Sequence, residues 1–246
     1  MTAHFAGNLT QQFTEFLGVR IVKGEFKEGD VVTAGSLQEE YGVSRTVVRE
    51  AFQILQSKGL IQPRTKTGTI VLGRWSWNLL DADVIAWYNT AGVGVQLVKK
   101  LEEVRQSYEP WAARTAAQRR TAEDLKEIRT AYERMISSTS EEGPDSSASV
   151  SADLAFHQAI LAATDNEIMV RLGLLIQPVL RIRNELTLHH DTNTDFLEDH
   201  RAVLDAIEKE QPDLAEQAMK GLLRRSAQDT AKFEGNEDEW ESTLLQ

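Results

Sequence analysis

The sequence predicts a mainly α-helical protein, in which an N-terminal winged helix-turn-helix is followed by a C-terminal all-α helical bundle. Two short helical segments joined by a tight turn, with a basic hairpin pattern after them, predict the winged helix. Apolar residues spaced three and four apart through the rest of the chain predict the bundle. We divide the 246 residues into a winged-helix domain (1–74), a junction (75–90), a helical domain (91–233) and an acidic tail (234–246).

The first domain opens with a predicted helix over residues 9–23, and a second helix is predicted over 36–41. Gly42 and Val43 then form the tight turn that a helix-turn-helix requires. Ser44 is a favourable N-cap, because its hydroxyl can accept a hydrogen bond from the first turn of the next helix. The helix that starts after Ser44 is therefore the predicted recognition helix.

Arg45 and Arg49 lie one turn apart on the predicted exposed face of this helix, with Thr46 beside them. The opposite face is apolar and predicts burial of Val48, Ala51, Phe52 and Leu55. Guanidinium groups at this spacing can meet guanine edges in a major groove or adjacent phosphates. The alternative is an ordinary solvated helix face, but the flanking turn and hairpin favour DNA contact.

A β-hairpin with a basic tip is predicted after the recognition helix. Residues 60–61 and 69–72 have the pattern of two short strands, and Gly59 can end the preceding helix. The segment between the strands carries Arg64 and Lys66, which places two positive charges near the tip. This hairpin is the predicted wing, and these two side chains are its candidate DNA contacts.

Charge is divided unevenly along the chain, whose net charge is −11. Residues 1–74 carry a net charge of +2, whereas residues 75–246 carry −13. Because DNA repels the acidic part, this division favours one docking orientation.

Composition also bears on the cellular compartment. The chain contains no cysteine, which excludes disulfides and thiolate metal ligands and suits a reducing compartment. No apolar run approaches the roughly 20 residues that a membrane helix needs, and no secretory leader is evident at Met1. We therefore expect a soluble cytoplasmic protein without a membrane partner.

Several runs in the first domain resemble the DNA-binding domain of the GntR family of bacterial transcription regulators. The resemblance rests on residues 29–30, 41–51, 58–61 and 68–71. It implies a winged helix and a double-stranded DNA partner. Two positions depart from the family pattern: Gly35 stands where the family usually has Glu, and Lys66 where the wing usually has its first Gly.

The remaining chain is predicted to be helical, and the serine-rich stretch 137–151 is predicted to be a mobile loop. Before it, Trp75, Trp77 and Trp87 predict packing at the junction. The predicted helices span residues 95–118, 122–136, 152–164, 168–188, 196–209 and 213–233.

Polar residues interrupt the apolar stripes of these helices. Asp153 and His157 are four apart on one face, His200 shares a stripe with leucine and valine, and Arg105 falls between apolar neighbours. An ionisable group on an inward face is costly unless it has a partner. Four such groups on three separate helices predict a shared polar cavity.

Two interpretations of this cavity remain open on the residues alone. Asp153, His157 and His200 can offer one oxygen and two imidazole nitrogens to a divalent metal, or each can satisfy a helix end or another side chain in a wet core. Arg105 can hold a carboxylate bidentately, or it can form a buried salt bridge to Glu109 or Asp153.

The second domain resembles the all-helical effector domain of the FadR subfamily, called FCD. The resemblance rests on residues 104–105, 109–110, 112–113, 153–157, 166 and 199–207. It implies that Asp153, His157 and His200 hold a divalent metal such as Zn²⁺, which helps to bind a small carboxylate effector. Leu222 stands where many members have a further histidine ligand. We also count Arg181 among the effector-binding candidates.

The junction 77–87 is similar to that of a branch of this subfamily whose members answer to aldonic or related sugar acids. We therefore predict a homodimeric regulator, more specifically a repressor of sugar-acid catabolism, that binds an inverted-repeat operator and is released by a small carboxylate such as an aldonate. Alternatives are a regulator that responds to another hydroxy acid or to a fatty acyl ligand, or a mononuclear metal hydrolase.

Overall fold

The computed structural model describes residues 9–143, 146–187 and 195–231, and the chain divides into two compact units, Met1–Gly94 and Val95–Gln246. Residues 75–90, which the sequence sets apart as a junction, lie within the first unit. The predicted acidic tail lies outside the described residues.

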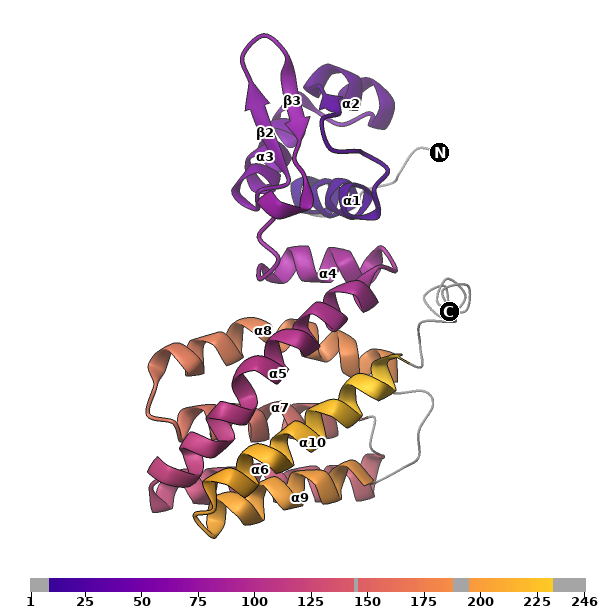
Figure 1. Ribbon diagram of the computed structural model, residues 1–246. Helices are drawn as coiled ribbons and strands as arrows, with labels where there is room; N and C mark the ends of the chain where they lie inside the picture. Colours follow the sequence, from indigo (N-terminus) through magenta and orange to yellow (C-terminus); the bar gives the residue numbers. More distant parts are fainter. Residues whose placement is uncertain (1–8, 144–145, 188–194, 232–246) are drawn as a thin grey trace. The chain divides into compact units, whose positions relative to one another are not determined.

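The first unit is a winged helix followed by a further helix (Figure 1). Its three strands form an antiparallel sheet in the order β1-β3-β2, in which Ile61 of β2 pairs with Val71 of β3. The elements are α1 (Leu9–Lys23), β1 (Val31–Val32), α2 (Ala34–Tyr41), α3 (Arg45–Ser57), β2 (Ile61–Arg64), β3 (Gly68–Val71), the 3₁₀ helix η1 (Arg74–Ser76) and α4 (Ala82–Thr90).

The turn between α2 and α3 has the predicted chemistry. Gly42 ends α2 in the left-handed region with φ 67°, a conformation that glycine adopts without steric cost. Ser44 caps α3, and its Oγ accepts a hydrogen bond from the Val47 backbone N–H at 3.3 Å. The predicted helix-turn-helix and its cap are both confirmed.

Helix α4 packs against α1 of the winged helix and is also attached to the end of α3. Trp87 is buried against Gly18 of α1, where an added Cβ would lie 2.5 Å from the indole ring. Lys58, at the C-terminal end of α3, forms ion pairs of 2.7 Å with Asp81 and with Asp83. The sequence predicted packing roles for three junction tryptophans, and that prediction is wrong for one of them: Trp75 is fully exposed on the short helix η1.

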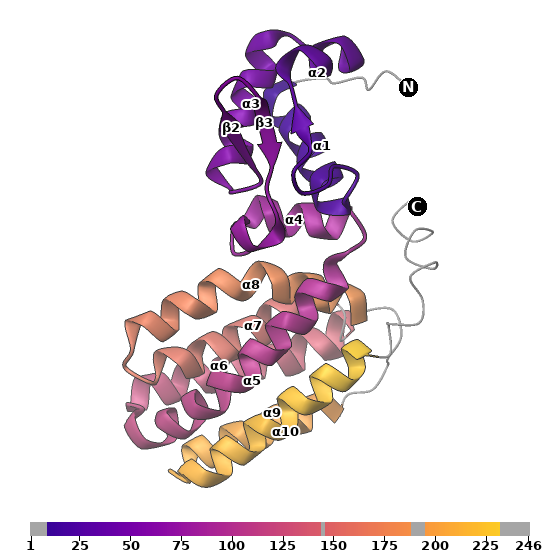
Figure 2. The ribbon, with the colours of Figure 1, turned by 45° about the horizontal axis from the view of Figure 1, so that its top comes forward.

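All the secondary structure described in the second unit is helical. In Figures 1 and 2, α5 runs alongside α10. Ser226 of α10 donates a hydrogen bond to Glu102 of α5, and Arg114 of α5 donates to Glu216 of α10, so the two helices are antiparallel. Helix α6 packs on α7 and α9, α7 packs on α8, and α9 packs on α10. The helices are α5 (Gly94–Arg119), α6 (Ala122–Glu142), α7 (Ser147–Ala162), α8 (Glu167–Thr187), α9 (Asp195–Glu208) and α10 (Pro212–Ala231).

The serine-rich stretch is largely helical, so its prediction as a mobile loop is wrong. Helix α6 continues to Glu142, and α7 begins at Ser147. The hydroxyls of Ser138 and Ser140 donate to backbone carbonyls one turn earlier, at 2.7 Å and 2.9 Å. Serine is tolerated within a helix when its hydroxyl is bonded in this way. Nowhere in the described parts of the chain is a helix long and apolar enough to cross a membrane.

Candidate nucleic-acid interface and buried polar cluster

The N-terminal end of α3 presents its polar side chains to solvent. Arg45, Thr46 and Arg49 are exposed, whereas Val48 and Leu55 on the other face are fully buried. Burial of the apolar stripe fixes the rotation of the helix, so the two guanidinium groups face outward together. This face is suited to contact with a DNA groove.

The wing carries two further cations. Arg64 ends β2 opposite Gly68, and Lys66 lies in the loop between β2 and β3; both side chains are exposed. Lys66 has φ 66°, in the left-handed region. A glycine would adopt this backbone freely, which gives a physical reason for the glycine expected at this point of the wing.

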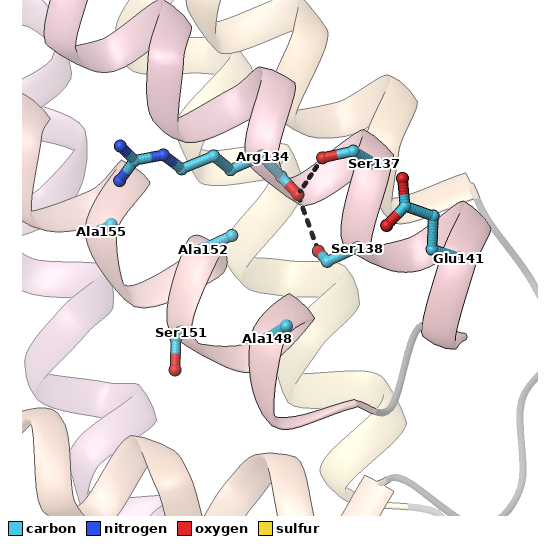
Figure 3. Close-up of a pocket in the computed structure, with 8 residues that line it drawn as sticks. All are labelled: Arg134, Ser137, Ser138, Glu141, Ala148, Ser151, Ala152 and Ala155. Atoms are coloured by element: carbon cyan, nitrogen blue, oxygen red, sulfur yellow. Dashed lines mark hydrogen bonds between the residues drawn. The ribbon is translucent and has the colours of Figure 1, made fainter.

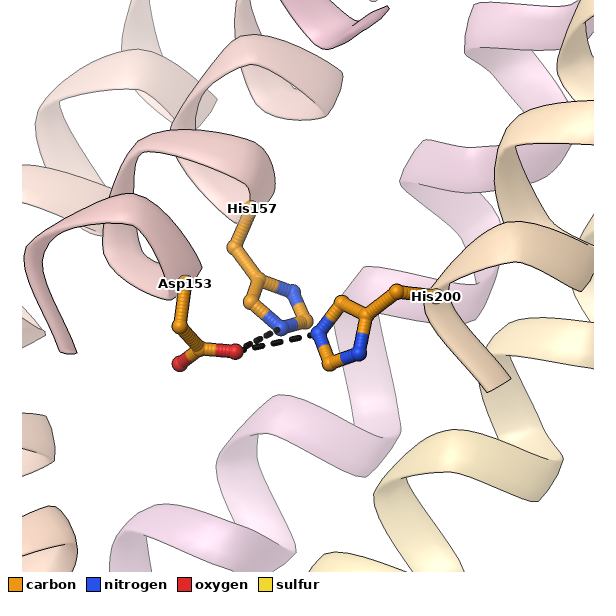
Figure 4. Close-up of side chains that lie close together, drawn as sticks. All are labelled: Asp153, His157 and His200. Carbon is orange, nitrogen blue, oxygen red and sulfur yellow. Dashed lines mark hydrogen bonds and ion pairs between the residues drawn. The ribbon is translucent and has the colours of Figure 1, made fainter. Parts of the chain in front are cut away.

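In the second unit, the four inward-facing polar residues predicted from the sequence are all buried. Arg105 lies on α5, Asp153 and His157 lie on α7, and His200 lies on α9. Figure 4 shows the Asp153 carboxylate beside the two imidazole rings, with Oδ1 at 3.0 Å from Nε2 of His200 and 3.6 Å from Nε2 of His157. Three helices therefore bring these groups to one place.

Arg105 forms the buried salt bridge that was one of its two predicted roles. Its Nε donates to Oε1 of Glu109 at 2.6 Å, and its Nη2 donates to Oε2 of the same carboxylate at 3.3 Å. The third guanidinium nitrogen, Nη1, is buried and has no hydrogen-bond partner in the part of the chain that the structure describes. Because Arg105 is fully buried, that unused donor requires an explanation.

Both histidines are oriented by hydrogen bonds at Nδ1. Nδ1 of His200 lies 2.7 Å from the carbonyl oxygen of Phe196, and Nδ1 of His157 lies 2.8 Å from Oε2 of Glu109. A carbonyl or carboxylate oxygen can only accept, so Nδ1 carries the hydrogen in each ring. The Nε2 atoms are thus the ones directed toward Asp153, as in many metal-binding histidines.

Electrostatics in the cluster favour charged Glu109. Burial by itself raises the pKa of a carboxyl, but the Arg105 charge, together with His157, lowers the pKa of Glu109 to about 2. Burial lowers the pKa of His157, and the neighbouring Glu109 charge more than reverses this, so the net shift is upward. The cluster thus concentrates negative charge around the imidazole rings.

The donor set fits a divalent metal. Asp153, His157 and His200 each offer one ligand atom, and these atoms lie within 4.8 Å of one another. One carboxylate oxygen and two imidazole nitrogens are common ligands of zinc. Leu222, where the family resemblance expects a histidine, is buried and offers no ligand atom. The described ligand set is therefore three residues.

Sequence reasoning missed Glu102 and considered Glu109 only as a salt-bridge partner. Both are buried on α5, where Glu102 lies three residues before Arg105 and Glu109 lies four residues after it, so all three share one helical face. The signal was present as an i, i+3, i+7 pattern of charged residues, but such a pattern usually marks a solvated face. Arg181 lies on α8, and its side chain lies outside what the structure describes.

A surface hollow of about 330 Å³ lies between α6 and α7 (Figure 3). Small residues line it, and the hydroxyls of Ser137 and Ser138 donate to the backbone carbonyl of Arg134. The α7 residues that line it include Ala148 and Ala152, next to the inward face that carries Asp153. Because the hydroxyls of Ser137 and Ser138 already donate to the backbone, we assign this hollow no ligand.

A winged helix with exposed arginines on its recognition helix is typical of DNA-binding regulators. The chain belongs to the GntR family of bacterial regulatory proteins: the model of that family matches residues 9–71, and the FCD domain model matches residues 100–225. It is a DNA-binding transcription regulator and not an enzyme. The alternative of a metal hydrolase is therefore wrong.

Curated relatives extend over most of the chain. The galactonate operon transcriptional repressor of Escherichia coli is 34% identical over 222 residues, which cover 89% of this chain and 95% of that protein. The Uxu operon transcriptional regulator of Escherichia coli is 30% identical over 231 residues, which cover 89% and 85%. LutR of Bacillus subtilis, a helix-turn-helix transcriptional regulator, is 31% identical over 206 residues, covering 81% and 90%.

Solved structures show the same fold. The structure of Lar, which controls expression of the Listeria monocytogenes agr system, matches with a TM-score of 0.62 at 17% identity and covers 94% of this chain and 100% of that one. A GntR protein of Streptococcus agalactiae matches with a TM-score of 0.50 at 21% identity, covering 89% and 99%. These likenesses concern the fold alone.

Proposed function

We propose that this regulator is a homodimeric repressor of sugar-acid catabolism, released from its operator by a small carboxylate such as an aldonate. The observation that carries the proposal is the buried cluster around Arg105, where a guanidinium with an unused N–H group lies 3.2 Å from His157 of the metal-ligand set. The protein would act in the cytoplasm, where bacterial chromosomal DNA lies.

The winged helix supplies the DNA contacts. Arg45, Thr46 and Arg49 read or clamp the major groove, and Arg64 and Lys66 position the wing. In a homodimer, two copies of this surface meet two half-sites related by two-fold symmetry. The operator is then an inverted repeat.

The buried cluster supplies the effector site. Asp153, His157 and His200 hold a divalent ion such as Zn²⁺, which adds positive charge that attracts a carboxylate. Arg105 donates from Nη1 to the effector. The charges agree with this: Glu102, Glu109 and Asp153 against Arg105 leave an excess of two negative charges among the described groups, which a divalent ion neutralises.

The effector class follows from the polar character of the cluster and from the relatives. Buried charges suit a small anionic ligand better than a long apolar chain, which disfavours the fatty acyl alternative. The name of the galactonate operon repressor favours sugar acids, and other hydroxy acids remain the second candidate. Arg181 stays a proposed effector contact on the sequence alone.

Calorimetry tests the effector site. Galactonate, gluconate, glucuronate and lactate are titrated into protein loaded with Zn²⁺ and into protein treated with chelator. We expect one or more acids to bind the zinc-loaded protein, and chelator to weaken that binding. Heat from none of the acids in the presence of zinc would contradict the proposal.

An arginine-to-lysine pair provides the matched control. Arg105→Lys keeps a positive charge but cannot pair with Glu109 and a ligand through separate edges, so acid affinity falls by about tenfold or more. Arg129→Lys makes the same change in an exposed ion pair with Glu208 and leaves acid affinity unchanged. Equal acid affinity in the two variants removes Arg105 from the site.

A further inference from the structure

Glu102 is a buried carboxylate with one oxygen bonded and one oxygen unused. Its Oε1 accepts a hydrogen bond from Oγ of Ser226 on α10 at 3.0 Å. Its Oε2 is buried and has no hydrogen-bond partner among the described residues, and the residue is only 4% exposed. A buried charged acceptor without a partner is energetically costly, so this oxygen needs a partner other than the described side chains around it.

The same face of α5 holds the matching donor. Arg105 follows Glu102 by three residues, and its Nη1 is likewise buried and finds no partner among the residues described. No ion pair joins the two side chains, although the negative charge of Glu102 is among the causes that raise the pKa of Arg105. A donor and an acceptor therefore lie one helical turn apart and do not satisfy each other.

We infer that Glu102 is a specificity-determining residue of the effector site, which accepts a hydrogen bond from a hydroxyl group of the acid while Arg105 Nη1 donates to its carboxylate. The inference rests on the proposed function above. A hydroxylated carboxylate presents both complementary groups in one molecule. A carboxylic acid without hydroxyl groups pairs with Arg105 but leaves Oε2 of Glu102 unsatisfied.

The negative charge of Glu102 both disfavours acids without hydroxyl groups and favours hydroxy acids. Its negative charge repels the effector carboxylate unless a hydroxyl donor intervenes, so it acts against simple acids as well as in favour of hydroxy acids. A site that hydrogen-bonds a ligand hydroxyl rejects analogues that lack it far more strongly than an apolar pocket rejects a change of size. The bond to Ser226 holds the carboxylate in position for this role.

The test compares galactonate with hexanoate, which has the same carbon chain without hydroxyl groups. Zinc-loaded wild type, Glu102→Gln and Glu103→Gln are titrated with both acids by calorimetry. Glu103 is the exposed neighbour of Glu102 on α5, so its variant carries the same change of charge outside the cluster. The measured quantity is the ratio of galactonate affinity to hexanoate affinity.

We expect Glu102→Gln to weaken galactonate binding by about 10- to 100-fold, the value of one hydrogen bond to a charged group, with hexanoate binding unchanged or stronger. Glu103→Gln keeps the wild-type ratio. Glu102→Asp, which retains the charge on a shorter side chain, gives an intermediate ratio and serves if the glutamine variant does not fold.

Two outcomes separate the inference from the proposed function. If wild type binds galactonate and Glu102→Gln keeps the same affinity ratio, Oε2 holds only a buried water and this inference is wrong while the proposed function stands. If zinc-loaded wild type binds neither galactonate nor any of gluconate, glucuronate and lactate, both are wrong.

Discussion

At the tip of the wing, Lys66 combines a positive charge with a left-handed backbone. Its φ of 66° is a conformation that costs a residue with a Cβ roughly 1 kcal/mol or more relative to glycine. The side chain is exposed, so its burial does not offset this cost. A charge retained at a strained position is consistent with a role in DNA contact.

Replacing Lys66 separates strain from charge. Lys66→Gly relieves the backbone, so we expect the winged helix to unfold at no lower denaturant concentration than wild type. Loss of one phosphate contact should reduce the slope of log affinity for DNA against log salt by about one. Lys100→Gln, the same loss of charge at an exposed site on α5, leaves the slope unchanged; equal slopes in all three proteins would remove Lys66 from the interface.

Single side chains also mark the limit of what the sequence could predict at the site. Asp153 and His157 were found because an i, i+4 pair shares one helical face, and the stripe around His200 indicated burial. Glu102 could not be found in this way, since it is followed by the exposed Glu103 and only packing decides which carboxylate turns inward. Likewise, sequence alone could not choose between the two roles of Arg105.

Among elements, long helices were the most predictable. The predicted helix over residues 9–23 matches α1, and the helices that became α5, α8, α9 and α10 end within two residues of their predicted ends. Strand β1 was missed because two residues, Val31–Val32, carry no periodic pattern; only pairing with β3 makes them a strand. The serine-rich stretch 137–151 was wrongly predicted as a loop, because the packing of α6 on α7 outweighs the low helix propensity of its serines.

Helix α4 shows how one element is attached to another by a glycine. Gly18→Ala places a methyl group 2.5 Å from the Trp87 ring, so we expect the first unit to lose about 1 to 3 kcal/mol of unfolding free energy through overpacking. Gly221→Ala on α10 meets nothing within 4 Å and should stabilise the second unit by about 0.5 to 1 kcal/mol. Denaturant unfolding of the two variants checks both signs.

An unchanged midpoint for Gly18→Ala would mean that Trp87 of α4 does not pack against Gly18 in solution. The ion pairs of Lys58 with Asp81 and Asp83 would then be the remaining attachment of α4 described above.

On the scale of the whole molecule, the winged-helix domain and the rest of the chain carry net charges of opposite sign. The first 74 residues are net positive and the rest strongly negative, at +2 and −13. The basic surface is exposed on α3 and the wing, while the buried cluster gathers its charges inside a helical bundle. An effector changes DNA affinity only through a difference in its affinity for two states of the protein, and such coupling is typically about 1 to 3 kcal/mol.

The most direct measurement is operator binding with and without the acid. A labelled inverted-repeat duplex, selected by the protein from a random pool, is titrated with protein by fluorescence anisotropy at fixed salt, in buffer and in saturating galactonate. We predict preference for this duplex over a scrambled one, and a 5- to 150-fold loss of affinity on adding the acid, corresponding to about 1 to 3 kcal/mol. Identical isotherms with an acid that calorimetry shows to be bound, or no preference over the scrambled duplex, would contradict the account.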